Sequence, residues 1–130
     1  MKPENILIIG LRNVDAIEQE FLNFKKIKHL KIEEVRKNNN VAQLIKDFVK
    51  NFDAWYLSLD IDVLDIKYAP GTGYPEKNGM KLNELLHIID GIKNMRNLKR
   101  IDLVEVNPLK DKKNKTIMSA KKIIDEFVQR

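Results

Sequence analysis

Apolar residues are grouped along the chain in short runs that predict buried β-strands. Residues 6–11 (ILIIGL) form a continuous apolar run, and residues 54–62 and 98–106 are also strand-like. Residues 27–32 (IKHLKI) alternate weakly and predict a fourth, short strand. The three stronger strands each end in Gly, Asp, Asn or Pro, residues that commonly stop a strand.

Between these runs the spacing of apolar residues changes to three or four, which predicts helices. The predicted helices cover residues 15–24, 41–52, 82–95 and 116–129, with Asp15 and Thr116 as N-caps. In the first helix the residues expected to face the core are Ile17, Phe21 and Leu22. In the last helix they are Ile117, Ala120, Ile123, Ile124 and Phe127.

The order of these elements is strand, helix, repeated four times. Such alternation predicts an α/β fold, a three-layer α/β/α arrangement with a mostly parallel sheet of about four strands. With 130 residues, the chain is expected to form a single domain over residues 1–130. Ligands of such folds bind beyond the carboxyl ends of the strands, so the residues that end each strand are the candidate site.

Composition narrows the function classes. The chain is 43% hydrophobic and 33% charged, with no cysteine, which excludes disulfides and thiolate metal sites. No apolar run approaches the roughly 20 residues that span a bilayer, and no signal peptide is recognisable, so we expect a cytoplasmic protein without membrane contact. The net charge is +5, but the lysines are scattered and not interleaved with aromatic residues, which favours a solvated surface over nucleic-acid binding.

The stretch SLDIDVLD places two aspartates at the end of the third predicted strand. Residues two apart in a strand point to the same side, so Asp60 and Asp62 are expected to lie next to each other. Their carboxylates would repel, and a hard divalent cation such as Mn²⁺ or Mg²⁺ would relieve the repulsion. The alternative is that both are ordinary strand-end and turn residues. Asp65 is expected to anchor the following loop instead of binding metal.

Glu105 is the second candidate, because it lies in the apolar run IDLVEVNP. A buried carboxylate needs a partner, and a guanidinium ligand could supply two parallel hydrogen bonds. An internal ion pair, for example with Arg12, is the alternative. In the loop after the aspartates, Gly71 and Gly73 are expected to adopt backbone conformations forbidden to other residues. The two histidines, His29 and His87, are expected to be structural or surface residues.

Taken together, these motifs resemble the ureohydrolases, which comprise arginase, agmatinase, formiminoglutamase and their relatives. SLDIDVLDIKYAPGTGYP is similar to the family motif S-[FL]-D-[IV]-D-x-L-D-P-x-x-x-P-x-T-G-T-P, and IDLVEVNP to D-[IV]-[MV]-E-[VL]-N-P. IIGLRNVDAIEQE resembles the family's I-G-I-R-D-x-D segment, and KTIMSAKKIIDE its closing helix. Two positions depart from the pattern: Ile66 replaces a proline, and Tyr74 replaces a threonine near the substrate pocket.

The resemblance implies hydrolysis of a small guanidino substrate to urea and an amine at two manganese ions. It implies that Asp60 is a bridging metal ligand, Asp62 a ligand of one ion, and Glu105 the acceptor of the substrate guanidinium. Family members are roughly twice this length, and the similarity is to their C-terminal half. The motifs G-G-D-H and D-A-H-x-D, which supply the histidine ligands and two further aspartates, do not occur in this chain.

These observations leave four possibilities. The first is one chain of a split ureohydrolase, inactive alone and completed in trans by an N-terminal half. The second is a non-catalytic relic that serves as a binding or assembly module. The third is a truncated product, and the fourth a basic nucleic-acid-binding domain. A homo-oligomer is compatible with the first two but could not restore activity, since every copy lacks the same histidines.

The resemblance also implies a gap in the sheet. In the family the strand that carries D-A-H-x-D lies between strands that this chain contains. We therefore expect either a gap or an altered strand order, with exposed strand edges that invite pairing with another chain. The motifs do not distinguish arginine, agmatine and formiminoglutamate as the substrate. The loop APGTGYPE resembles agmatinase-like members slightly more than the others.

Overall fold

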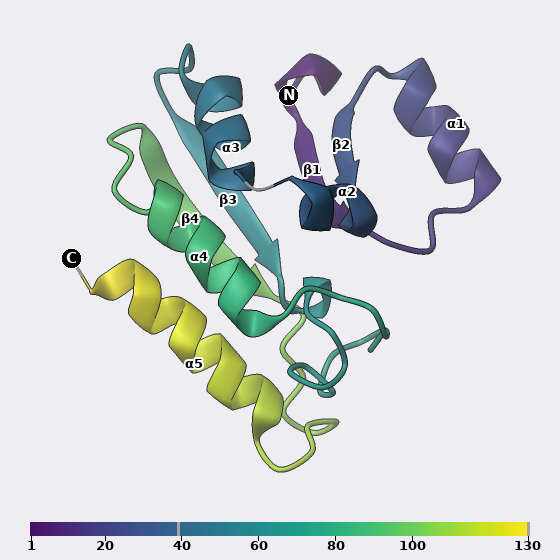
Figure 1. Cartoon of the computed structure of the whole chain (residues 1–130), viewed down its shortest axis with the longest axis vertical. Helices are drawn as coiled ribbons and strands as arrows, with labels where there is room; N and C mark the ends of the chain where they lie inside the picture. The colour runs from purple at the N-terminus through teal and green to yellow at the C-terminus, as the bar shows by residue number, and fades with distance from the viewer. Residues whose placement is uncertain (39, 130) are drawn as a thin grey trace. The chain divides into compact units, whose positions relative to one another are not determined.

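The computed structural model of the chain describes residues 1–38 and 40–129 (Figure 1). Its contacts divide it into two compact units, Met1–Asn39 and Asn40–Arg130, and each is described by itself below. The expectation of a single domain stays a prediction.

The first unit is a small parallel β-α-β arrangement. Strands β1 (Leu7–Leu11) and β2 (Lys28–Lys31) pair in parallel, and α1 (Ala16–Phe24) connects them. A short turn, η1 (Pro3–Asn5), precedes β1, and α2 (Ile32–Lys37) follows β2. The pairing register shifts at Gly10, whose φ of 90° is accessible mainly to glycine.

The helix boundaries in this unit follow from local hydrogen bonds. The Asp15 carboxylate accepts the Glu18 N–H at 2.8 Å, and the Glu18 carboxylate accepts the Asp15 N–H at 3.1 Å, which confirms the predicted cap. Only Leu22 of the three predicted core residues of α1 is buried; Ile17 is 79% exposed and Phe21 is also exposed. A two-stranded sheet offers too little area to cover the whole apolar stripe of the helix. The unpredicted helix α2 buries Ile32 and Val35.

The second unit carries the remaining elements. These are α3 (Val41–Val49), β3 (Trp55–Asp60), η2 (Ile61–Val63), α4 (Leu82–Ile92), β4 (Leu98–Val104) and α5 (Lys115–Val128). Figure 1 shows α3 and α4 in front of the β3–β4 pair, with α5 beside α4. The buried residues alternate along β3, where Leu59 is buried while Tyr56 and Ser58 are exposed. One face of this sheet therefore packs on the helices, whose buried residues include Val41, Ile45, Val49, Leu85, Ile89, Ile92 and Ile123.

The four predicted strands are present and their pairing is parallel, which confirms the α/β fold class. They do not form one sheet, however. Among the described residues, β1 pairs only with β2, and β3 pairs only with β4. The expectation of either a gap or an altered strand order stays a prediction, because the two pairs belong to different units. Within each unit, the outer edges of the strand pair lack a neighbouring strand in the described part of the chain.

Two strands end earlier than predicted, because a side chain or an unusual backbone angle turns the chain. The strand predicted to reach residue 62 ends at Asp60, whose carboxylate accepts the N–H of Asp62 at 3.0 Å and begins η2. The strand predicted to reach residue 106 ends at Val104, because Glu105 has a φ of 62° in the left-handed region. Helices α3 and α4 likewise end at Val49 and Ile92, three residues short of the prediction.

The predicted cap of the last helix is wrong. The N-cap is Asn114, which makes no side-chain capping hydrogen bond. Asp111 accepts the N–H groups of Thr116 and Ile117 instead, each at 3.0 Å, so a residue three positions before the N-cap caps the helix. Of the residues predicted to face the core, Ala120 and Ile123 are buried, but Ile117 and Ile124 are exposed.

Asp65 anchors the long loop between η2 and α4, as predicted. Its carboxylate accepts the N–H groups of Lys67 at 2.9 Å and of Asn78 at 2.7 Å. Its own N–H donates to the carbonyl of Met80 at 2.9 Å. Burial alone would raise the pKa of Asp65, but these backbone donors stabilise the carboxylate and lower the pKa overall.

This pKa predicts a loss of stability in acid. A carboxyl group whose folded pKa is depressed stabilises the fold above its unfolded value of about 3.9, and that contribution is lost as the pH falls through the lower folded value. We expect Asp65→Asn to be less stable than the wild-type chain at pH 7, but to lose less stability between pH 6 and pH 3. Urea unfolding at both pH values measures this, with exposed Asp47→Asn as control. An unchanged pH dependence in Asp65→Asn would contradict the prediction.

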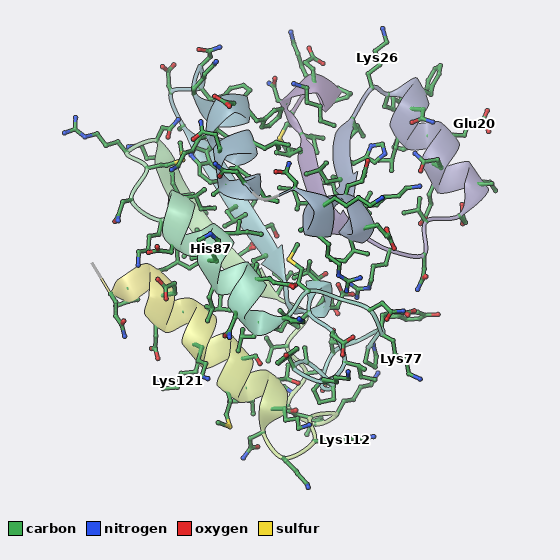
Figure 2. The ribbon with its side chains drawn as sticks, in the orientation of Figure 1. Glu20, Lys26, Lys77, His87, Lys112 and Lys121 are labelled. Carbon is green, nitrogen blue, oxygen red and sulfur yellow. The ribbon has the colours of Figure 1, made fainter. Side chains whose placement is uncertain are left out.

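Exposed lysines lie on several elements of the second unit. In Figure 2, Lys77, Lys112 and Lys121 lie on two different loops and on α5, and all three are exposed. Among the described residues, none of the helices combines the length and apolar content needed to cross a bilayer.

Candidate functional site

The predicted site residues of the second unit come together at one edge of its sheet. Asp60, the last residue of β3, pairs with Val104, the last residue of β4. Neighbouring strands lie about 4.8 Å apart. Asp60 at the end of β3 and Glu105 directly after β4 therefore lie at the same edge of the sheet. This is the carboxyl edge, where ligands of parallel α/β sheets bind.

Asp60 and Asp62 are adjacent for a different reason from the one predicted. Asp62 is not on the strand but in η2, so the two residues do not share a strand face. The hydrogen bond from the Asp62 N–H to Asp60 Oδ1 turns the backbone after β3 and keeps the two residues next to each other. Both are partly buried at the sheet edge. Asp60 Oδ2 is not used by this bond, so a lone pair of that carboxylate can face a cation.

The chemistry of these residues fits part of a hard-cation site. Carboxylate oxygens are the donors that Mn²⁺ and Mg²⁺ prefer. In the part of the chain that the structure describes, however, no group of three His, Asp, Glu or Cys residues is placed to hold a metal ion. His29 interacts with Gln19 and with the Ile27 carbonyl in the first unit, and His87 is exposed on α4 (Figure 2). The role of Asp60 and Asp62 as metal ligands therefore stays a prediction.

Glu105 is exposed, so the expectation that it is buried in the strand is wrong. It follows β4 directly, in the left-handed region of backbone conformation. For a residue other than glycine this region costs about 1–2 kcal/mol, and such strained positions are concentrated at functional sites. Exposure leaves the carboxylate able to meet a ligand from solvent. The ion pair with Arg12, which belongs to the first unit, stays a prediction.

The loop that contains Gly71 and Gly73 lies against Glu105 and the segment after it. The Asn107 N–H donates to the Gly71 carbonyl at 2.9 Å, and the Lys110 ammonium donates to the Gly73 carbonyl at 3.4 Å. A Cβ on Gly73 would lie 2.7 Å from Glu105 Oε2. A Cβ on Gly71 would lie 2.6 Å from the Cα of Asp111.

The reason for these two glycines is therefore close approach, not backbone conformation. Neither has a positive φ, so the sequence-based interpretation of both is wrong. Gly71 lets the loop backbone pack on the backbone of Asp111, and Gly73 lets it touch the Glu105 carboxylate.

Substituting alanine at the two glycines is expected to affect stability differently. Gly71→Ala meets backbone atoms that cannot move independently, so we expect a loss of roughly 1–3 kcal/mol of unfolding free energy. Gly73→Ala meets only the end of a flexible, exposed side chain, so stability should change by about 0.5 kcal/mol or less. It should instead turn the Glu105 carboxylate away. Urea unfolding and the side-chain NMR couplings of Glu105 measure the two effects, and equal destabilisation by both substitutions would contradict this.

Two polar clusters were not found from the sequence. On the outer face of the sheet, the Tyr56 hydroxyl donates to Asp102, and hydrogen bonds from Tyr56 and then Ser58 lower the pKa of Asp102. Near α5, Asp111 accepts from Thr116. The first could be anticipated only from the strand register, which pairs Ser58 with Asp102. The second has a sequence signal, an aspartate five residues before the threonine that begins a helical pattern.

Comparisons with known proteins identify the family of this chain. Residues 1–129 match the model of the Arginase family. The arginase of Staphylococcus aureus strain COL is 33% identical over 98% of this chain, which covers 43% of that protein. The arginase of Bacillus subtilis strain 168 is 31% identical over 98% of this chain, which covers 44% of it.

Solved structures give the same result. The arginase from Bacillus caldovelox superposes with a TM-score of 0.93 at 31% identity, over 100% of this chain and 44% of that one. A hypothetical agmatinase from Burkholderia thailandensis has a TM-score of 0.85 at 27% identity, over 99% and 39%. The chain thus spans less than half the length of these relatives. On the family match over residues 1–129, the chain belongs to the arginase family of ureohydrolases.

Proposed function

We propose that this chain is the C-terminal half of an arginase-like manganese ureohydrolase, which hydrolyses a guanidino substrate when a second polypeptide supplies the N-terminal half. The observation that carries the proposal is the carboxyl edge of the β3–β4 sheet, where Asp60 ends β3 and Glu105 directly follows β4. In this proposal Asp60 and Asp62 are metal ligands, and Glu105 accepts the substrate guanidinium. The bound metal ions would supply a nucleophile at neutral pH.

The chain's own residues have defined tasks in this proposal. The exposed Glu105 carboxylate accepts two parallel N–H bonds from a planar guanidinium and orients its carbon toward the metal side of the site. Asp62 donates its backbone N–H to Asp60 and so holds one Asp60 oxygen in place. Because the described residues hold too few metal donors, the isolated chain is expected to be inactive.

The need for a second polypeptide is supported by an open face of the β3–β4 sheet. Parallel strands are normally covered on both faces. Here Tyr56 is 50% exposed and Val104 is 36% exposed on the face opposite the helices, in the part of the second unit that the structure describes. A partner that adds a strand and covers this face would bury these side chains.

Capture of the tagged chain from its native host tests the proposal. Proteins that come with it are identified by mass spectrometry, and we expect one that carries G-G-D-H and D-A-H-x-D. With manganese, the purified pair should release urea from arginine or agmatine, or formamide from formiminoglutamate. A chain that is recovered alone as a well-folded species would contradict the split enzyme and leave the non-catalytic relic.

The open face gives a sharper test of association. Val104→Lys places an ammonium where the partner is expected to cover the sheet, and removing this charge from water should weaken association about tenfold or more, even with Asp60 opposite it. Met118→Lys, at an exposed apolar position of α5 (58% exposed, against 36% for Val104), is the control and should bind the partner normally. Equal affinity of both variants, measured by titration calorimetry, would show that the partner does not cover this face.

A further inference from the structure

We infer that Asp111 and Thr116 are positioning residues for Glu105, which they hold through the loop that carries Gly71 and Gly73. The inference rests on the proposed function for the role of Glu105 as guanidinium acceptor. The chain of contacts that supports it belongs to the fold itself, and it runs from the start of α5 to the end of β4.

The first link joins the two positioning residues. Asp111 Oδ1 accepts the Thr116 N–H at 3.0 Å and the Thr116 hydroxyl at 2.9 Å, while Oδ2 accepts the Ile117 N–H at 3.0 Å. Burial alone would raise the pKa of Asp111, but these donors lower it overall, so the carboxylate stays charged. Thr116 is fully buried. Its hydroxyl proton is committed to Asp111, which leaves the oxygen lone pairs to accept.

The second link joins Thr116 to the loop. The Gly71 N–H donates to Thr116 Oγ1 at 2.7 Å, a buried hydrogen bond between positions 45 residues apart. The Gly71 carbonyl accepts the Asn107 N–H at 2.9 Å. Both backbone polar groups of Gly71 are therefore held, and its Cα packs against the backbone of Asp111. This position of the loop has little freedom to move.

The third link joins the loop to Glu105. Gly71 is hydrogen-bonded to Asn107. Gly73, two residues after Gly71, contacts the carboxylate of Glu105, which precedes Asn107 by two residues. Thr72 between the two glycines is fully buried, which keeps the loop against the fold. Glu105 itself is exposed, and its contact with the Gly73 backbone limits where its carboxylate can point.

This arrangement explains how an exposed glutamate could be a specific acceptor. Two parallel hydrogen bonds to a guanidinium require a fixed carboxylate plane. A misplacement of about 1 Å can lower the rate up to a hundredfold. The carboxylate of an exposed glutamate rotates freely unless another group contacts it. The fixed backbone of Gly73 supplies that contact. Loss of the Thr116 hydroxyl would remove the hydrogen bond to Gly71 and let the loop that contains Gly73 move.

The test compares Thr116→Val with Thr116→Ser. Valine keeps the size of threonine but cannot accept from Gly71, whereas serine keeps the hydroxyl. On the full chain, hydrogen exchange of the Gly71 amide should be about tenfold faster or more in Thr116→Val, and near wild type in Thr116→Ser. The three-bond side-chain couplings of Glu105 should shift toward rotamer averaging only in Thr116→Val.

The assembled enzyme adds a kinetic measurement. We expect kcat/KM for the guanidino substrate to fall about tenfold in Thr116→Val and to recover within about twofold in Thr116→Ser. If Thr116→Val does not fold, Asp111→Asn replaces it, because the amide keeps one acceptor oxygen while removing the charge. Faster Gly71 exchange with unchanged Glu105 couplings would overturn the inference. Failure to assemble an active enzyme would count against the proposed function alone, because the exchange and coupling measurements need only this chain.

Discussion

If the proposed two-chain ureohydrolase exists, replacing Asp60 with asparagine is expected to lower its manganese-dependent activity about a thousandfold. A metal ion contributes several kcal/mol to such a reaction, and each 1.36 kcal/mol corresponds to a factor of ten in rate. An amide oxygen is a neutral, weaker donor to a hard cation than a carboxylate. The side-chain oxygen of asparagine can still accept the Asp62 N–H, so the turn after β3 should survive the substitution.

This separation of fold from chemistry makes the experiment decisive. The melting temperature of Asp60→Asn should stay within a few degrees of wild type, while manganese affinity, measured by titration calorimetry on the assembled enzyme, should fall in parallel with kcat. Asp47→Asn removes a carboxylate of the same type from the exposed surface of α3 and should leave both quantities unchanged. Activity of Asp60→Asn within about threefold of wild type would remove Asp60 from the metal site.

The largest effect on stability is expected for Ile123→Ala, a substitution in the middle of α5. Ile123 is 1% exposed, and truncating a buried isoleucine to alanine costs about 2–5 kcal/mol through lost burial and the cavity that remains. With a urea m-value of about 1–3 kcal/mol/M, the unfolding midpoint should fall by roughly 1–3 M. Circular dichroism of the chain during urea titration measures this.

The neighbouring residue provides a matched control. Ile124 is 51% exposed, so Ile124→Ala removes the same atoms from the same helix without opening a cavity. Alanine also has the higher helix propensity, so the change in unfolding free energy should stay within about 0.5 kcal/mol. A loss at Ile124 as large as that at Ile123 would mean that the exposed side of α5 is covered by another molecule under the conditions of the measurement.

These two isoleucines illustrate a limit of the sequence pattern. Helical spacing identifies α5 and its apolar character, but it placed both Ile123 and Ile124 in the core. Which part of a wide apolar stripe is buried depends on how much neighbouring surface is present. The same limit applies to α1, where only Leu22 is buried. In both helices the area available for packing, not the periodicity, decides burial.

The candidate site shows a similar division. The motif around Asp60 and the glutamate at Glu105 could be identified from the sequence, because short polar insertions at the ends of apolar runs mark the carboxyl edge of a parallel sheet. Their local geometry could not. Asp62 was assigned to the strand and lies in a turn, and Glu105 was expected to be buried and is exposed.

The α/β class, the four parallel strands, the family and the candidate ligands could be predicted from the sequence, because they depend on periodicity and on motifs that are local in the chain. The division of the strands into two separate pairs, and the need for Gly71 and Gly73 at points of close approach, became known from the three-dimensional contacts. These contacts also connect Asp111 and Thr116 to the loop beside Glu105. These features depend on contacts between residues up to 45 positions apart, and a local sequence pattern does not predict such contacts.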